Sequence, residues 1–173
     1  ELSKILGQYE YIKDFDDFVI PFRCNATDLI SGQDILLSEG SLVTAIRASV
    51  SIPSVFAPVD YNNQLLVDGG VKNNIPVNLA QKYNPDIIIT SAVASSKPTK
   101  NQIKSSIIDV VGESIFIHTS DFIKSNLKKS DYVISTKLPD GVSPIFNKKS
   151  ISSIYKAGKK SVYDNIDTFL DIK

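Results

Sequence analysis

Short runs of apolar residues predict six strands along the chain. The run over residues 86–93, with three consecutive isoleucines, is the clearest buried strand. Residues 18–26 suggest another buried strand, interrupted by Pro21. An Asn62-Asn63 pair is typical of a turn between two further strands. The remaining strands are expected at 33–38, around Val59, at 65–67 and at 132–135.

Apolar residues at helical spacing predict helices between these strands. Ser41 can cap one of them through its side-chain oxygen, and Pro76 fits the first turn of another because its missing N–H needs no partner there. A helix, a short loop and the apolar strand at 86–93 follow in the order typical of a parallel sheet. We therefore expect an α/β fold with a mostly parallel sheet flanked by helices. The helices are expected within 1–14 and at 42–48, 76–83, about 103–122 and 150–170.

The composition fits one globular domain without a strong overall charge. The 173 residues are 42% hydrophobic and 22% charged, which is enough apolar material for a core. Lysine plus arginine equal aspartate plus glutamate at 19 each, so no overall field draws the chain to nucleic acid or anionic lipid. We expect no nucleic-acid partner, and any contact with a membrane surface should be transient and local.

The hydropathy and the single cysteine indicate whether the chain spans a membrane and in which compartment it lies. No stretch approaches the roughly 18 apolar residues of a membrane span, so we expect no integral membrane segment. The lone Cys24 lies in an apolar run, which favours a buried small side chain over a nucleophile. These features favour a cytoplasmic location. The chain begins at Glu1 and contains no methionine, so we interpret it as a fragment.

Asp68 is the strongest candidate for chemistry because it follows a short apolar strand. A carboxylate after residues 65–67 would emerge at the carboxyl end of that strand, where α/β sheets place their sites. Gly69 and Gly70 permit positive φ and leave room for a backbone or a substrate to approach the carboxylate. The alternative interpretation is a tight turn in which the Asp68 side chain bonds its own backbone.

Residues 26–86 carry an ordered series of short motifs. They are Ala-Thr-Asp-Leu at 26–29, Gly-Ser-Leu at 40–42, Arg-Ala-Ser-Val-Ser-Ile-Pro at 47–53, Phe-Ala-Pro-Val at 56–59, Leu-Val-Asp-Gly-Gly-Val at 66–71 and Asn-Asn-Ile-Pro-Val at 73–77. The series resembles the C-terminal half of the bacterial patatin-like phospholipase family, over most of the chain from about Phe18 onward. The resemblance implies a three-layer α/β/α fold in which residues 1–173 are the C-terminal portion of a single domain, incomplete on its N-terminal side.

The resemblance also implies a lipid acyl hydrolase that uses a serine–aspartate dyad. A serine attacks a lipid ester, and Asp68 would be the general base that accepts its proton. Gly69, Gly70, Ser49 and Asn74 would shape the site, and we expect neither a cofactor nor a metal. The expected partners are a lipid or ester substrate and an N-terminal segment that carries the serine in a Gly-x-Ser-x-Gly turn.

No serine of this chain fits the nucleophile. Gly112-Glu113-Ser114 is the nearest approximation, but Phe116 replaces the second glycine and the segment reads as mid-helix. His118 falls in the same amphipathic helix, and the dyad needs no histidine. We therefore expect the isolated chain to be inactive. The alternative is a non-catalytic binding or interaction module with an exposed sheet edge.

Asp28, Arg47 and Ser51 are better explained by structure than by catalysis. Asp28 could line the site, but we expect it to hold a turn through its side chain. Arg47 is expected to pair with a carboxylate or to cap backbone carbonyls near the end of its helix. Ser51, like Ser49, is expected to shape the site or cap a turn.

Overall fold

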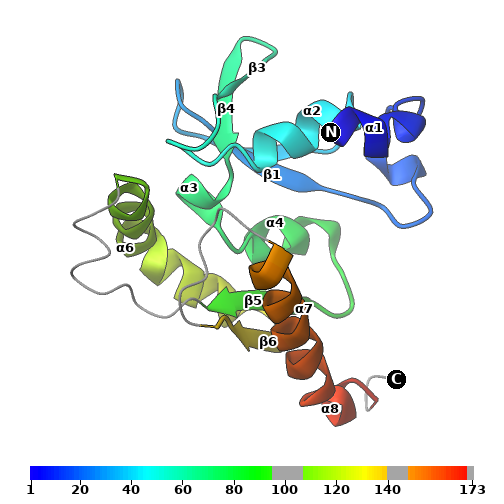
Figure 1. Ribbon diagram of the computed structural model, residues 1–173. Coiled ribbons are helices and arrows are strands. Elements are labelled where there is room, and N and C mark those ends of the chain that lie inside the picture. The colour runs from blue at the N-terminus through cyan, green and yellow to red at the C-terminus, as the bar shows by residue number, and fades with distance from the viewer. Residues whose placement is uncertain (95–106, 140–147, 171–173) are drawn as a thin grey trace.

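The chain contains both helices and strands in the computed structural model, which describes residues 1–94, 107–139 and 148–170 (Figure 1). The N-terminal part contains α1 (Leu2–Leu6), the 3₁₀ turns η1 (Gly7–Tyr9) and η2 (Phe15–Asp17), β1 (Cys24–Asp28), β2 (Asp34–Leu37), α2 (Leu42–Ser49), β3 (Val59–Tyr61) and β4 (Gln64–Asp68). The C-terminal part contains α3 (Gly70–Asn73), α4 (Val77–Ala80), η3 (Gln81–Tyr83), β5 (Ile89–Ala94), α6 (Ile107–Leu127), β6 (Tyr132–Lys137), α7 (Lys148–Tyr163) and α8 (Ile166–Leu170).

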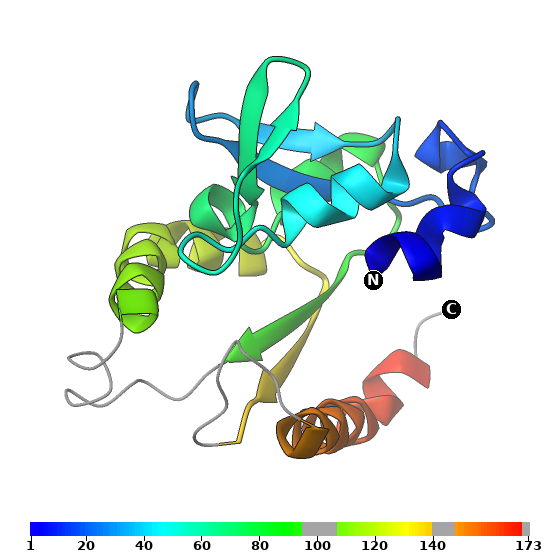
Figure 2. The same cartoon turned by 45° about the horizontal axis from the view of Figure 1, so that its top comes forward.

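The N-terminal strands form a four-stranded antiparallel sheet in the order β2-β1-β4-β3. Short turns join β1 to β2 and β3 to β4, which allows antiparallel pairing, whereas a parallel pair needs a long crossover. Asn62 and Asn63 both have positive φ, 49° and 63°, as a tight hairpin turn requires. The predicted Asn62-Asn63 turn is confirmed. The resulting β3–β4 hairpin projects away from β5 and β6 in both views (Figures 1 and 2).

β5 and β6 form a separate two-stranded sheet in which the strands run parallel. α6 lies between them in the chain, and α7 packs against β6. This arrangement confirms the predicted α/β class. Within the described residues, however, parallel pairing is limited to β5 and β6. We expect a mostly parallel sheet from the sequence. This expectation is wrong for the described residues, because the four-stranded sheet is antiparallel.

The main hydrophobic core lies between α2 and the four-stranded sheet. Its buried side chains are Phe15, Ala26, Leu37, Leu42, Ala45, Ala48 and Leu66. Ser41 caps α2 as predicted, because its Oγ accepts the Thr44 N–H at 3.1 Å. The core therefore holds β1 and β4 against one helix, and β4 leads directly to Asp68.

Two predicted strands differ from the structure. β1 begins at Cys24 rather than near residue 18, and Val19 and Ile20 are exposed, because Pro21 cannot donate a hydrogen bond to a strand ladder. β5 is not the buried strand that we expect from its sequence, since Ile89 and Val93 are 48% and 63% exposed. An apolar run predicts burial only where another layer covers it, and the described layers leave these side chains uncovered.

The predicted helices are confirmed with altered ends. The helix expected at 76–83 divides into α4 and η3, and Asn84 ends it with a left-handed φ of 48°. The long helix is α6, whereas Ile103, predicted to belong to it, lies outside the described residues. The terminal helix divides into α7 and α8. None of the helices that the structure describes is long and apolar enough to cross a membrane.

Candidate active site

Asp68 lies at the carboxyl end of β4, as predicted. The strand leads to it through Leu66 and Val67, which are buried, and Asp68 itself pairs with Ala26 of β1. The Asp68 N–H donates to the Ser51 carbonyl at 3.0 Å. Main-chain contacts with β1 on one side and with residue 51 on the other therefore fix the position of this residue.

The Asp68 carboxylate is half-buried and has a single hydrogen-bond donor among the described residues. Its Oδ1 accepts the Gly70 N–H at 2.7 Å. Burial raises the pKa of Asp68 above its ordinary value, and the Gly70 N–H opposes this shift. The hydrogen bond of the turn interpretation is thus present. Within the described part of the chain, the other oxygen of the Asp68 carboxylate, Oδ2, accepts no hydrogen bond.

Asp28, on the neighbouring strand β1, has the opposite environment. Its carboxylate accepts hydrogen bonds from the Ile30 N–H, from the Ser31 N–H and hydroxyl, and from the Leu65 N–H. The Ser31 hydroxyl contributes most to lowering the pKa of Asp28 to about 2. Asp28 therefore holds a turn, as predicted, and a carboxylate with so low a pKa is a poor proton acceptor.

A side chain on Gly69 or Gly70 would approach neighbouring groups closely. A Cβ on Gly69 would lie 2.6 Å from the backbone oxygen and the side chain of Asn25. A Cβ on Gly70 would lie 2.9 Å from Asn74 Oδ1 and 3.0 Å from Asp68 Oδ1. The predicted close approach is present, but the suggestion of positive φ is wrong. Gly69 has a φ of −60°, and Gly70 is the first residue of α3.

The other two predicted site residues have different neighbours. Asn74 lies beside the Asp68 carboxylate, since the side-chain oxygens of both approach Gly70. Ser49, at the end of α2, instead forms a hydrogen bond with the Cys24 thiol, whose pKa burial raises to about 11. Cys24 is therefore a protonated, partly buried thiol rather than a nucleophile. The structure brings Gly69, Gly70 and Asn74 to Asp68 and leaves Ser49 with Cys24.

Ser51 and Arg47 support the strand that carries Asp68. Ser51 is fully buried; its carbonyl accepts the Asp68 N–H, and its hydroxyl donates to the Arg47 carbonyl at 2.6 Å. The Arg47 guanidinium contacts the Ser51 hydroxyl and donates from Nη2 to the Ala57 carbonyl at 3.0 Å. Arg47 thus donates to a backbone carbonyl, as predicted, but to one in the loop between α2 and β3 rather than one near the end of its helix.

The family model for patatin-like phospholipases matches residues 2–80. We call residues 2–80 the patatin-like segment because of this similarity. The resemblance inferred from the ordered motifs is confirmed for residues 2–80, whereas the similarity expected beyond residue 80 stays a prediction. This segment contains Asp68 and each of the residues described above as its neighbours or supports.

Three relatives are similar to part of this chain. An uncharacterized NTE family protein of Mycobacterium tuberculosis (strain ATCC 25618 / H37Rv) is 37% identical over 78 residues, which are 45% of this chain and 22% of the relative. The lysophospholipase NTE1 of Meyerozyma guilliermondii is 32% identical over 82 residues, 47% of this chain and 6% of the relative. Probable lipid hydrolase 463L of Invertebrate iridescent virus 6 is 42% identical over 88 residues, 49% of this chain and 30% of the relative. The chain therefore spans less than a third of the length of each of these proteins.

Outside the patatin-like segment, α6 carries Ser114 and His118. Both side chains are exposed, and the Ser114 hydroxyl donates to the Val110 carbonyl at 2.8 Å. The mid-helix placement predicted for them is confirmed, and neither lies at a strand-to-helix turn. Across residues 1–94, 107–139 and 148–170, no group of three or more His, Cys, Asp or Glu side chains is arranged to hold a metal ion.

α6 also carries Asn126, a fully buried residue that our sequence reasoning missed. Its Nδ2 donates to the Ile75 carbonyl at 2.7 Å, to Asn78 Oδ1 at 3.1 Å and to Asn73 Oδ1 at 3.2 Å. The only signal in the sequence is spacing, because Asn126 follows the buried Thr119 by seven residues and shares its helix face. Asn126 belongs to a polar cluster that reaches the patatin-like segment, the asparagine cluster, which comprises Asn25, Asp34, Asn73, Asn78 and Asn126.

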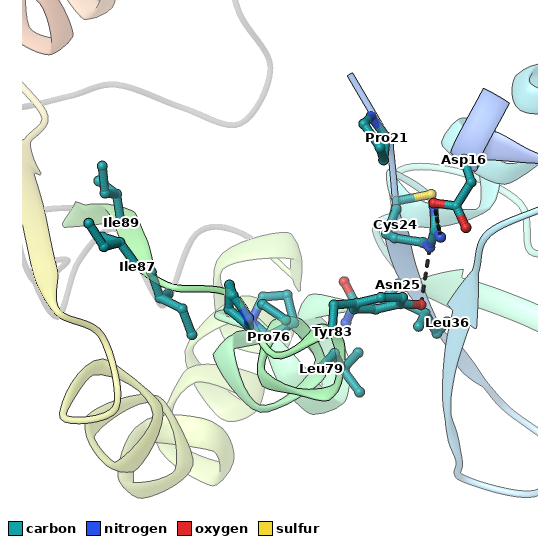
Figure 3. A pocket seen from close by; sticks show the side chains of 14 residues that line it. Asp16, Pro21, Cys24, Asn25, Leu36, Pro76, Leu79, Tyr83, Ile87 and Ile89 are labelled. Carbon is teal, nitrogen blue, oxygen red and sulfur yellow. Dashed lines mark hydrogen bonds and ion pairs between the residues drawn. The ribbon is translucent and has the colours of Figure 1, made fainter. Parts of the chain in front are cut away.

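A cavity of about 600 Å³ lies between β1 and the segment from α4 to β5 (Figure 3). Its walls are mostly apolar, with Cys24 and Leu36 on one side and Leu79 and Ile87 on the other. Asp68 does not line it. This cavity is therefore separate from the candidate base of the patatin-like segment.

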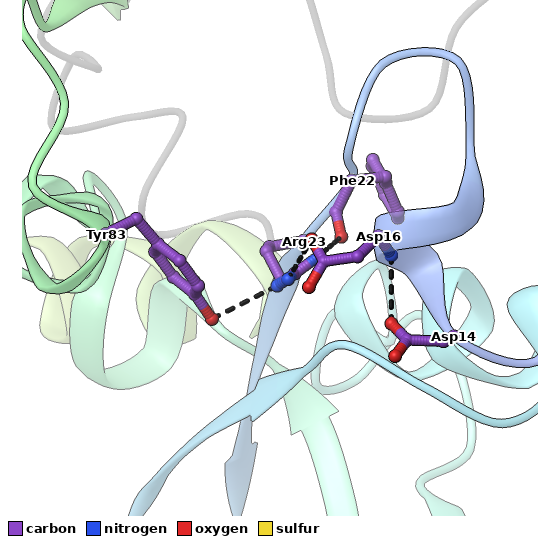
Figure 4. Close-up of polar contacts among 5 residues, drawn as sticks. All are labelled: Asp14, Asp16, Phe22, Arg23 and Tyr83. Atoms are coloured by element: carbon purple, nitrogen blue, oxygen red, sulfur yellow. Dashed lines mark hydrogen bonds and ion pairs between the residues drawn. The ribbon is translucent and has the colours of Figure 1, made fainter.

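Arg23 lies at the edge of this cavity with its guanidinium already engaged (Figure 4). It forms an ion pair with Asp16, donates from Nε to the Tyr83 hydroxyl at 3.1 Å, and donates from Nη1 to the Phe22 carbonyl at 2.7 Å. The hydrogen bond with Asp16 is the main cause of the raised pKa of Arg23. Arg23 thus ties η2 to η3 across the cavity and is not a free site for an anionic ligand.

Proposed function

We propose that this chain supplies the general base of a lipid acyl hydrolase and that Asp68 is this base. The observation that carries the proposal is the Asp68 carboxylate, which is half-buried at a strand end with one N–H donor and a raised pKa. Such a carboxylate accepts a proton more readily than a fully hydrogen-bonded one such as Asp28. The patatin-like segment, and relatives named as a lysophospholipase and a lipid hydrolase, support lipid esters as the substrate class.

In the proposed reaction, a serine hydroxyl donates a hydrogen bond to Asp68 and attacks the carbonyl carbon of a lipid ester. Its proton passes to the carboxylate as the serine–acyl bond forms, and then to the leaving alcohol as the ester bond breaks. Water next attacks the acyl-serine and gives one proton to Asp68, which returns it to the serine oxygen as the fatty acid leaves. Each cycle therefore ends with Asp68 ionised and the serine protonated.

The serine is proposed to lie in a Gly-x-Ser-x-Gly turn on another segment of the parent protein or on a separate chain. Support comes from length, since the matched region is only 22% and 30% of the relatives from M. tuberculosis and the iridescent virus. A base without a nucleophile or oxyanion donors activates nothing. The 173-residue chain alone should therefore remain unlabelled by a fluorophosphonate probe, and labelling of a serine in this chain would contradict the proposal.

The decisive experiment joins this chain to the nucleophile-bearing segment and measures ester hydrolysis. Asp68→Ala and Asp68→Asn should each lower kcat by roughly a hundredfold or more, because general base catalysis contributes at least that much. Asp60→Asn is the matched control, since Asp60 is an exposed carboxylate on the adjacent strand β3. Hydrolysis that survives both Asp68 substitutions would exclude Asp68 as the base.

The second candidate function is a non-catalytic interaction module. The exposed apolar side chains of Ile87, Ile89 and Val93 in and before β5 favour it, because a partner could cover them. The sequence of the parent protein and its labelling by a fluorophosphonate probe distinguish the two functions. If it contains no Gly-x-Ser-x-Gly turn and is not labelled by fluorophosphonate, the interaction module is the better explanation.

A further inference from the structure

We infer that Asn126 is a positioning residue for Asp68 and acts through the short helix α3. The catalytic part of this inference rests on the proposed function of Asp68, whereas the structural part does not. Asn126 lies at the C-terminal end of α6, outside the region that matches the patatin-like family. The contacts of the asparagine cluster connect it to the carboxylate in three steps.

The first step is the contact between α6 and the segment that follows Asp68. Asn126 is fully buried, and its Nδ2 is the shared donor for Asn73 Oδ1, the Ile75 carbonyl and Asn78 Oδ1. An apolar residue at position 126 would leave these acceptors without that donor. Asn126 Oδ1 is itself buried without a hydrogen-bond partner among the described residues. The NH₂ group of Asn126 therefore explains why an asparagine occupies this position, whereas its side-chain oxygen contributes no hydrogen bond among the described residues.

The second step is the anchoring of α3 through its last residue, Asn73, which is also buried. Asn73 Nδ2 donates to Asp34 Oδ2 at 2.6 Å and to Asn78 Oδ1 at 3.0 Å. The Asn73 carbonyl accepts from Asn25 Nδ2 at 3.0 Å. Side chains from β1, β2 and α6 therefore meet at one end of α3.

The third step connects α3 to the carboxylate. α3 is only four residues long, Gly70–Asn73, and a helix of one turn does not persist without tertiary contacts. Its first residue supplies the N–H that Asp68 Oδ1 accepts at 2.7 Å. The cluster that anchors the end of α3 therefore fixes the donor at its beginning, and through this donor the orientation and the proton affinity of Asp68.

The test measures the pKa of Asp68 in the 173-residue chain by following its carboxyl carbon through an NMR titration. Asn126→Leu should raise this pKa further, because a displaced Gly70 N–H no longer favours the ionised form. Hydrogen exchange at the Gly70 amide should accelerate by roughly tenfold or more as α3 opens locally. Thr119→Val is the matched control, since it removes a buried hydroxyl from the same face of α6 whose bond stays within the helix, and it should change neither readout.

A milder variant covers the case in which Asn126→Leu does not fold. Asn78→Ala removes one acceptor of Asn126 and one of Asn73 from a half-buried position, so it should raise the Asp68 pKa in the same direction by less. If a folded Asn126→Leu leaves the Asp68 pKa and Gly70 exchange unchanged, the inference is overturned. The same result for Asn78→Ala overturns it when Asn126→Leu is unfolded.

Activity of the joined protein separates this inference from the proposed function. Asn126→Leu should lower kcat with little change in KM and should move the acidic limb of the kcat–pH profile to higher pH, as the Asp68 pKa rises. A purely structural residue would lower the active fraction without moving that limb. If Asp68→Asn keeps full activity while Asn126→Leu shifts the Asp68 pKa, the proposed function fails and the positioning contact stands.

Discussion

Gly69→Ala should destabilise the protein purely through steric contact, because the backbone of Gly69 already suits alanine. Its φ of −60° and ψ of −27° are helical values that any residue adopts, so no backbone strain enters. The added Cβ would lie 2.6 Å from the Asn25 backbone oxygen and equally close to the Asn25 side chain. The backbone oxygen cannot retreat without disturbing β1, which pairs with β4 from Ala26 to Asp28.

The size of the destabilisation by Gly69→Ala depends on which groups the added methyl group displaces. Overpacking a filled site costs about 1–3 kcal/mol. Turning the Asn25 side chain away would also break its bonds to Asp34 and to the Asn73 carbonyl, each worth about 0.5–1.5 kcal/mol. We expect a total loss of about 2–6 kcal/mol in the free energy of unfolding, which corresponds to a decrease in Tm of roughly 4–24 °C for a chain of this size.

Thermal unfolding followed by circular dichroism measures this loss, with Gly112→Ala as the matched control. Gly112 lies in α6, and a Cβ there would meet nothing within 4 Å. Alanine is favoured over glycine in a helix by about 0.8–1 kcal/mol, so Gly112→Ala should raise the Tm. The two substitutions should therefore act in opposite directions. A Gly69→Ala protein as stable as the unmodified chain would refute the close packing of Gly69 against Asn25.

Two further predictions concern the pH dependence of stability. Asp28 has a pKa of about 2 in the folded protein, below its ordinary value, so its stabilising contribution is present above about pH 4 and disappears as the pH falls toward 2. The loss of stability in Asp28→Asn should therefore be large at pH 5 and shrink toward pH 2 in urea denaturation, and a constant difference would contradict this. Asp68 has a raised pKa, so its contribution is present below the ordinary carboxyl pKa and disappears as the pH rises through the folded value. Asp68→Asn should gain stability relative to the unmodified protein between pH 3 and pH 7, and the opposite trend would rule out burial as the cause of the shift.

The features that were predictable from the sequence depend on short stretches of chain. Asn62-Asn63 forms its turn because asparagine tolerates the left-handed conformation, and Ser41 caps α2 because its oxygen reaches the Thr44 N–H. Asp68 lies at a strand end because the apolar residues before it are buried in β4. In each case the cause lies within a few residues of the effect.

Features that depend on contacts between distant segments were not predictable. The isoleucines of β5 are as apolar as those of a buried strand, and only the arrangement of layers shows that Ile89 is half exposed. The role of Asn126 depends on acceptors about fifty residues earlier in the chain, at Asn73, Ile75 and Asn78. No local pattern specifies such a pairing, because hydrogen bonds between side chains are set by tertiary packing.

Because main-chain groups hold Asp68, substitutions at neighbouring positions can leave its backbone in place. The Asp68 N–H bonds to the Ser51 carbonyl, and the strand itself is paired with β1 through backbone groups. Every amino acid except proline offers these same groups. Side chains of β1 and of the loop after α2 that take no part in the asparagine cluster, the Asp28 turn or the Ser51–Arg47 contact can therefore change while the backbone of Asp68 keeps its place. Gly69 is more restricted than Gly70, because an added methyl group would lie 2.6 Å from the Asn25 backbone oxygen at Gly69, whereas at Gly70 it would meet the ends of the Asn74 and Asp68 side chains.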